Sequence, residues 1–168
     1  LILEEGVQSI GTAAFPGCSK VTGDLVIPNS VTSMKGSAFQ SSTFTGSLSI
    51  GNGLTDIPTY AFHGCSSFKG EITIGENVKS IGDHAFEGCS GFTGNLIIPN
   101  KVETMGIYAF YACIGFEGYL SIGNSIKSIG KCAFVGKEDK KTHTVVDGGR
   151  EKQYTSYSWT RIFNKVYC

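Results

Sequence analysis

The stretch LIIPNKVETMGIYAFYACIGFEG, from Leu96 to Gly118, decides the fold because the same pattern recurs along the chain. Its Ala-Phe pair has a counterpart in every copy, and the successive phenylalanines lie 24, 23, 24, 24 and 24 residues apart. The six pairs are Ala14-Phe15, Ala38-Phe39, Ala61-Phe62, Ala85-Phe86, Ala109-Phe110 and Ala133-Phe134. A fixed period of this length is typical of repeat proteins, in which each copy forms one structural unit.

Five further apolar columns keep the same register. They begin at Leu1, Leu3, Val7, Ile10 and Val21 and recur with the period of the Ala-Phe pairs. One copy is too short to bury its own apolar side, but stacked copies bury one continuous core. The sequence therefore predicts a right-handed solenoid, in which each coil contacts only its neighbours.

The pattern within one copy predicts the local structure of a coil. Residues 96–98 are apolar, with the first and third in core columns, which suits a short strand, and Pro99 ends it. Residues 102–106 form a second extended segment, and residues 108–113 look like one or two helical turns. Strands one period apart should pair in parallel, about 4.8 Å apart.

Written as a consensus, the columns spell x-L-x-I-P-x-x-V-x-x-I-G-x-x-A-F-x-G-C-S-x-F-x-G, which resembles the BspA-type leucine-rich repeat. The resemblance covers residues 1 to about 134 and is clearest at 72–94 and 96–118. Departures are small: the second repeat lacks one residue, Ala112 replaces a glycine, and the pattern ends after Gly136. We assign residues 1–136 to six repeats, the first of them incomplete.

The resemblance implies a leucine-rich-repeat solenoid with short parallel strands on one face and helical turns or loops on the other. It also implies function, because the family is common in secreted and surface proteins of gut and oral bacteria and occurs in some parasitic protists. Members are associated with adhesion to host proteins or other cells. The expected role is thus an extracellular recognition or adhesion module, and the alternative is a structural spacer within a larger surface protein.

Residues 137–168 differ in composition from the repeats. A charged run at 137–141 reads as a loop, residues 142–146 as a possible strand, and the last stretch contains the only tryptophan, Trp159. An open solenoid end exposes core and strand edges, so we interpret this segment as a C-terminal cap, with an aromatic binding module as the alternative. No matching cap precedes Leu1, which suggests further repeats upstream or end-to-end self-association.

Four of the six cysteines, Cys18, Cys65, Cys89 and Cys113, share one column. Side chains stacked in parallel on neighbouring coils point the same way, which does not suit a disulfide, so we expect small buried thiols. A bridge between Cys132 and Cys168, outside the column, stays possible. No cysteine or histidine spacing suggests a zinc site.

Composition and motifs exclude several functional classes. Lys and Arg number 14 against 14 Asp and Glu, so nothing draws the chain to nucleic acid or an anionic membrane. No apolar run is long enough to span a bilayer. The chain has no nucleophile elbow, Walker motif or calcium loop, and His63 occupies a variable position expected to face solvent. We expect no enzymatic activity, cofactor or metal.

The variable outward positions are the remaining candidates for function. The expected partner is a protein or a glycan, bound at the sheet face formed by Asp24, Val26, Ser47, Ser49, Glu71, Thr73, Asn95, Ile97, Tyr119 and Ser121. A second candidate stripe is Tyr60, His84 and Tyr108. The alternatives are a plain solvated sheet face and simple ring stacking between coils. The chain lacks an N-glycosylation sequon, which favours a bacterial source. The resemblance to the BspA-type family implies a secreted or cell-surface location.

Overall fold

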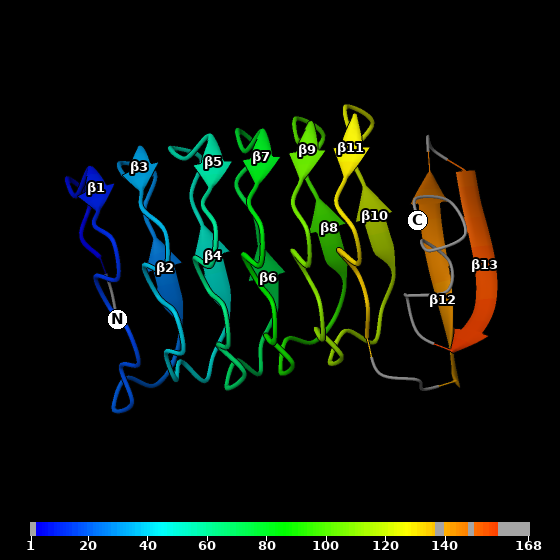
Figure 1. The fold of residues 1–168 in the computed structure, drawn as a ribbon, viewed down its shortest axis with the longest axis horizontal. Helices are drawn as coiled ribbons and strands as arrows, with labels where there is room; N and C mark the ends of the chain where they lie inside the picture. Colours follow the sequence, from blue (N-terminus) through cyan, green and yellow to red (C-terminus); the bar gives the residue numbers. More distant parts are fainter. Residues whose placement is uncertain (1–2, 137–139, 148–149, 158–168) are drawn as a thin grey trace.

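The chain forms a solenoid of stacked coils, each contributing two short strands (Figure 1). The computed structural model describes residues 3–136, 140–147 and 150–157. The first strands of successive coils are β2 (Leu25–Ile27), β4 (Leu48–Ile50), β6 (Ile72–Thr73), β8 (Leu96–Ile98) and β10 (Leu120–Ile122). The second strands are β1 (Ser9–Ile10), β3 (Ser33–Met34), β5 (Asp56–Ile57), β7 (Ser80–Ile81), β9 (Thr104–Met105) and β11 (Ser128–Ile129).

Neighbouring coils pair in parallel, and their register equals the repeat period. Leu25 lies opposite Leu48 and Ile97 opposite Ser121, while Ser80 of β7 lies opposite Thr104 of β9. The strands follow one another along the solenoid in the order β2, β4, β6, β8, β10 (Figure 1). The predicted leucine-rich-repeat solenoid with parallel strands is confirmed.

After the last repeat, a hairpin of β12 (Lys140–Asp147) and β13 (Arg150–Tyr157) extends the sheet. β12 pairs in parallel with β10 and antiparallel with β13, so the backbone of β12 continues the solenoid sheet (Figure 1). The predicted strand at 142–146 lies within β12. The division at residue 136 into repeats and cap stays a prediction, because residues 137–139, 148–149 and 158–168, Trp159 included, lie outside the described residues.

The core consists of the predicted columns, which run along the whole solenoid. The rings of the Ala-Phe column stack face to face: Phe39 and Phe62 have centroids 5.4 Å apart, and Phe62 and Phe86 5.1 Å apart. A second stack joins Phe68 to Phe92 at 4.7 Å. These phenylalanines are completely buried. Such ring pairs add roughly 0.5–1.5 kcal/mol each to the free energy of burial.

The helical turns predicted at the Ala-Phe segment are wrong, since the described residues contain no helix. Tyr60, just before the pair, has a φ of 58°. The Phe62 N–H then donates to the carbonyl of Ala85 in the next coil (2.8 Å), while the Ala61 N–H donates back to Pro58 (3.2 Å). An α-helix needs successive amides to bond within its own segment. Here alternate amides bond along the solenoid axis, so the segment folds as consecutive turns.

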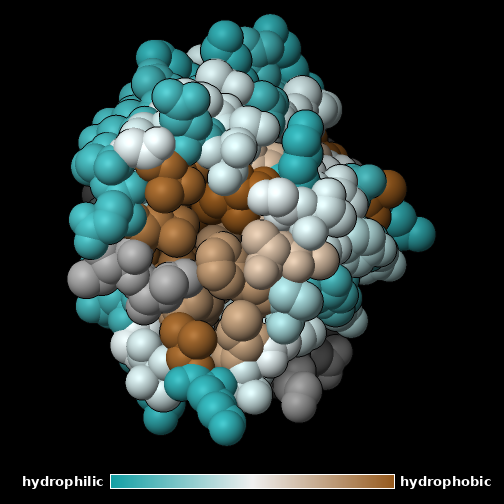
Figure 2. All heavy atoms as spheres, turned by 90° about the vertical axis from the view of Figure 1, so that its left-hand side faces the viewer, coloured by the Kyte–Doolittle hydropathy of each residue, from teal (hydrophilic) through white to brown (hydrophobic). Residues whose placement is uncertain are grey.

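The end of the solenoid that carries the first coil shows an apolar centre surrounded by hydrophilic residues (Figure 2). Leu3, Val7, Phe15 and Val21 pack against the core of the next coil and are only partly buried. Phe15 stacks on Phe39 at 5.1 Å through one face of its ring. The first coil therefore forms the main exposed apolar area in this view.

Candidate functional site

The ten predicted sheet-face residues lie on the first strands or directly before them. Six are exposed: Asp24, Val26, Glu71, Thr73, Ile97 and Tyr119. Four are half-buried: Ser47, Ser49, Asn95 and Ser121. The strand pairing brings them together in rows, with Ser49 opposite both Val26 and Thr73. The face is built as the alternation in the sequence predicts, with the apolar residues between them turned into the core.

Three large apolar side chains interrupt this polar face. Val26 is 41% exposed, Ile97 49% and Tyr119 39%. Ile97 and Tyr119 belong to neighbouring coils, where Leu96 lies opposite Leu120 in the parallel pairing. Exposed aliphatic and aromatic groups on a rigid sheet are the kind of anchors that a protein partner covers.

Two of the predicted face residues also hold neighbouring coils together. Asp24 Oδ1 accepts hydrogen bonds from the Ser47 N–H (2.7 Å) and the Ser47 Oγ (3.0 Å), and these bonds lower the pKa of the Asp24 carboxyl. Asn95 Oδ1 accepts from the Tyr119 N–H (3.0 Å). A Cβ at Gly118 would overlap the Asn95 amide oxygen, so this hydrogen bond between coils requires glycine at position 118. Asp24 and Asn95 therefore connect coils as well as facing outward.

The predicted aromatic stripe forms a continuous stack. Tyr60 and His84 are nearly parallel, with centroids 4.7 Å apart and an interplanar angle of 10°. His84 and Tyr108 are 5.3 Å apart and tilted by 30°. All three have positive φ angles, between 55° and 58°. Because His84 lies between the two tyrosines, neither face of its ring is open.

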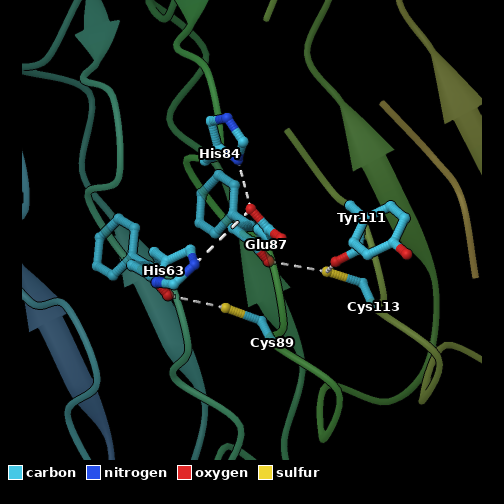
Figure 3. A network of polar contacts seen from close by, with 8 residues as sticks. His63, His84, Glu87, Cys89, Tyr111 and Cys113 are labelled. Carbon is cyan, nitrogen blue, oxygen red and sulfur yellow. Dashed lines mark hydrogen bonds and ion pairs between the residues drawn. The ribbon is translucent and has the colours of Figure 1, made fainter. Parts of the chain in front are cut away.

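His63 is not the isolated, solvent-facing residue that the sequence predicts. It is half-buried, and its Nε2 lies 3.7 Å from Oε2 of Glu87 in the next coil. The same carboxylate oxygen contacts Nδ1 of His84 (Figure 3). His63, Glu87 and Tyr111 occupy one column, which the 24-residue spacing could have revealed. These three residues join the aromatic stripe as functional candidates.

Three of the four cysteines in the column, Cys65, Cys89 and Cys113, are buried as predicted, and each bonds to the backbone of an earlier coil, whereas Cys18 in the first coil is only half-buried. Cys65 donates to the Phe39 carbonyl at 3.0 Å, and Cys89 to the Phe62 carbonyl at 3.1 Å (Figure 3). In the coil that lacks a cysteine, Ser42 donates to the Phe15 carbonyl at 2.6 Å. Burial raises the pKa of Cys89 well above its ordinary value. Cys89 therefore carries an unreactive thiol, whereas its side-chain hydrogen bond with Cys65 lowers the pKa of Cys65. The proposed partner of Cys132, Cys168, lies outside the described residues.

Comparison with known families identifies the repeat. The model of the BspA type leucine rich repeat region matches residues 1–116 and 59–148, with six copies. The chain belongs to this family. Leucine-rich repeats of this kind are generally protein-interaction modules, generally non-enzymatic, and the BspA type is often found in surface or secreted bacterial proteins.

A solved structure supports this assignment. A leucine-rich repeat protein from Bacteroides ovatus is similar over 81% of this chain, with 27% sequence identity and a TM-score of 0.68. The BspA-type chain spans 34% of the length of that protein. No curated protein sequence matches.

Two further properties of this BspA-type solenoid bear on function. The described part of the chain contains no group of three His, Cys, Asp or Glu side chains placed to hold a metal ion. Within the same residues, no helix is long and apolar enough to cross a membrane.

We predict that Cys89 and Cys113 of the BspA-type repeats resist alkylation. Burial raises the pKa of Cys113 as well as that of Cys89, which leaves almost no reactive thiolate at pH 8. Iodoacetamide at this pH should leave both unmodified in the folded protein and modify both in urea, as read by peptide mass spectrometry. The half-buried Cys18 should react before the buried cysteines of its column. Rapid modification of Cys89 in the folded chain would contradict the burial of this column.

Proposed function

We propose that this chain is a non-catalytic recognition or adhesion module of a secreted or cell-surface protein, binding a protein or glycan through the sheet face of its solenoid. The observation that carries the proposal is the exposure of Ile97 and Tyr119 on neighbouring coils. The fold does not need these side chains for its core, since Leu96, Ile98 and Leu120 on the opposite face supply it. Their exposure is thus better explained by a partner than by folding.

The composition of the face supports contact with a macromolecule. Small hydroxyl side chains surround the apolar anchors, with Thr73 and Ser121 in the positions equivalent to Ile97 on flanking coils. An apolar centre with a polar rim is the usual organisation of a protein-binding surface. Secretion and adhesion are supported by the family, whose members often belong to surface or secreted bacterial proteins.

A second candidate function is that of a structural spacer, with the ligand site elsewhere in a longer protein. Two observations favour it. Asp24 and Asn95 on the sheet face connect coils, and the chain spans only 34% of the length of the related Bacteroides ovatus protein. A spacer would use the stacked coils to set a distance between other parts of a surface protein.

Binding measurements with sheet-face variants separate these functions. We predict that the double variant Ile97→Ala, Tyr119→Ala weakens binding to its partner at least about tenfold, because truncating central apolar anchors costs more than about 1 kcal/mol each. The measurement is biolayer interferometry against a panel of purified extracellular-matrix proteins and glycans. Ile114→Ala is the matched control, since Ile114 is 39% exposed but lies outside the strands. Binding that survives the double variant, or no binding at all, supports the spacer.

The proposal includes end-to-end self-association through the apolar first coil. Figure 2 shows the surface that a second copy would cover. Phe15, which stacks on Phe39 through one face of its ring, would contribute its other face to this contact. Val7→Lys should then shift the apparent mass in light scattering from dimer to monomer at equal concentration. A monomer before substitution would leave the sheet-face proposal intact and exclude this one.

A further inference from the structure

A compact group of six side chains lies on the turns that follow the second strands β5, β7 and β9. We call it the turn patch, and it consists of Tyr60, His63, His84, Glu87, Tyr108 and Tyr111. The residues fill two columns in three consecutive coils. The stripe Tyr60, His84 and Tyr108 forms one column, and the other column, with His63, Glu87 and Tyr111, lies three residues further along the chain.

The fold does not require these residue types. The same two columns hold Ala13 and Pro16 in the first coil, and Ser37 and Gln40 in the second. Those coils have the same turn, with φ angles of 46° at Ala13 and 58° at Ser37. Small residues therefore satisfy the backbone equally well. The concentration of tyrosine, histidine and glutamate in the three middle coils calls for an explanation other than architecture.

The packing of the rings limits what the turn patch can bind. His84 stacks on Tyr60, while His63 meets Tyr60 edge-on at 5.4 Å and 75°. Tyr111 meets Tyr108 edge-on at 5.1 Å and 88°. The rings use much of their faces on one another, whereas a sugar needs an open aromatic face to stack on. This packing disfavours a glycan and leaves the polar atoms of the patch as its binding groups.

Glu87 is the charged centre of the turn patch. Its side chain is only 25% exposed, and its ion-pair contacts among the described residues are the two histidines, which carry charge only when protonated. By contrast, Glu103, on a neighbouring surface, has a lysine partner, Lys127, at 2.5 Å. A partly buried carboxylate with no lysine or arginine beside it attracts a cation more strongly than an exposed one, because water screens it less.

The three tyrosines of the turn patch contribute further oxygen atoms. In the described part of the chain, no hydrogen bond involves the hydroxyls of Tyr60, Tyr108 or Tyr111, so all three are open to a partner. Asp83, exposed and next to His84, adds negative charge nearby. Carboxylate and hydroxyl oxygens together are acceptors for the several N–H donors of a guanidinium or ammonium group.

We propose that the turn patch binds a cationic side chain, arginine or lysine, presented by a protein partner. Glu87 supplies the charge, the tyrosine hydroxyls supply further acceptors, and the rings exclude water from the ion pair. The inference rests on the proposed function only in that the chain recognises a protein; the surface is a different one from the sheet face. A metal ion fits less well, because the described residues contain no group of three His, Cys, Asp or Glu side chains placed to hold one.

The test is an NMR titration of the full chain with two synthetic peptides, GSGRGRGSG and its glutamine counterpart GSGQGQGSG. The arginine peptide should produce saturable shifts in the amide signals of residues 60–63, 84–87 and 108–111, and the glutamine peptide should not. Glu87→Gln should weaken arginine-peptide binding at least about fivefold, since the ion pair is lost. Glutamine fits this column, because Gln40 occupies it in the second coil.

Two controls make the outcome decisive. Glu103→Gln removes a carboxylate that already has a lysine partner and should leave the dissociation constant unchanged. Tyr111→Phe keeps the ring packing but removes one hydroxyl, and it should weaken binding measurably. Equal shifts with both peptides, no shift at millimolar peptide, or an unchanged affinity in Glu87→Gln would overturn the proposal. Because the peptides do not address the sheet face, failure here leaves the Ile97 and Tyr119 proposal standing.

Discussion

Replacing Ile98 with aspartate is expected to destabilise the protein by at least about 4 kcal/mol, enough to unfold the coils around it. Ile98 is 2% exposed, and Ile122, which lies opposite it on β10, is a partly buried apolar residue that packs against the core. A carboxylate at this position would have no cation or hydrogen-bond donor from a side chain to compensate for the loss of water. Urea unfolding followed by circular dichroism measures the loss.

The adjacent residue provides a matched control for this prediction. Ile97 lies on the same strand, but its side chain points to the other face and is 49% exposed. Ile97→Asp introduces the same charge in the same backbone environment and should change the free energy of unfolding by less than about 1 kcal/mol. Similar losses in both variants would show that the strand does not alternate between core and surface as the structure has it.

Phe86→Ala should cost roughly 3–5 kcal/mol, the usual range for truncating a buried aromatic residue. The ring is completely buried and stacks between Phe62 at 5.1 Å and Phe110 at 4.8 Å. Its removal therefore opens a cavity and ends the stack on both sides. Because each coil depends on its neighbours, we expect the loss to spread to the flanking coils. Amide hydrogen exchange should accelerate in these flanking coils, relative to the unsubstituted protein, more than it does in the first coil.

The end of the same stack provides the comparison. Phe15 contacts one ring instead of two and is only partly buried. Phe15→Ala should consequently cost about half as much or less, measured by the same unfolding transition. A loss below about 1 kcal/mol for Phe86→Ala would mean that the Ala-Phe column does not hold the coils together.

The sequence determines the coil framework because its period reports which residues become neighbours. Residues 24 apart lie side by side on adjacent coils, so Phe62 and Phe86 could be placed in contact without a structure. The same reasoning failed at the Ala-Phe turn. The segment has the composition of a short helix, but its alternate amides bond to the next coil, as Phe62 does to Ala85. Local composition does not report this competition between bonds within a coil and bonds between coils.

The candidate sites were predictable only in part, for a related reason. Alternation along a strand placed Ile97 and Tyr119 on the surface correctly. It did not show that Asn95 reaches the Tyr119 amide, because this depends on the length and direction of one side chain. The contact of His63 with Glu87 could have been predicted from their 24-residue spacing, which places the two residues side by side on adjacent coils. The variability of the column indicated only that His63 faces solvent. The chemistry of a partner is not encoded in the period at all.

The hydrogen bonds that replace the helical turns run from coil to coil, along the length of the molecule. A force applied to the two ends would therefore load the successive interfaces in series, and the weakest would open first. Each coil that detaches would release roughly 80 Å of extended chain, while the remaining stack would keep its shape. Under tension the solenoid would behave as an extensible tether that lengthens in steps, and the coils would stack again when the tension is removed.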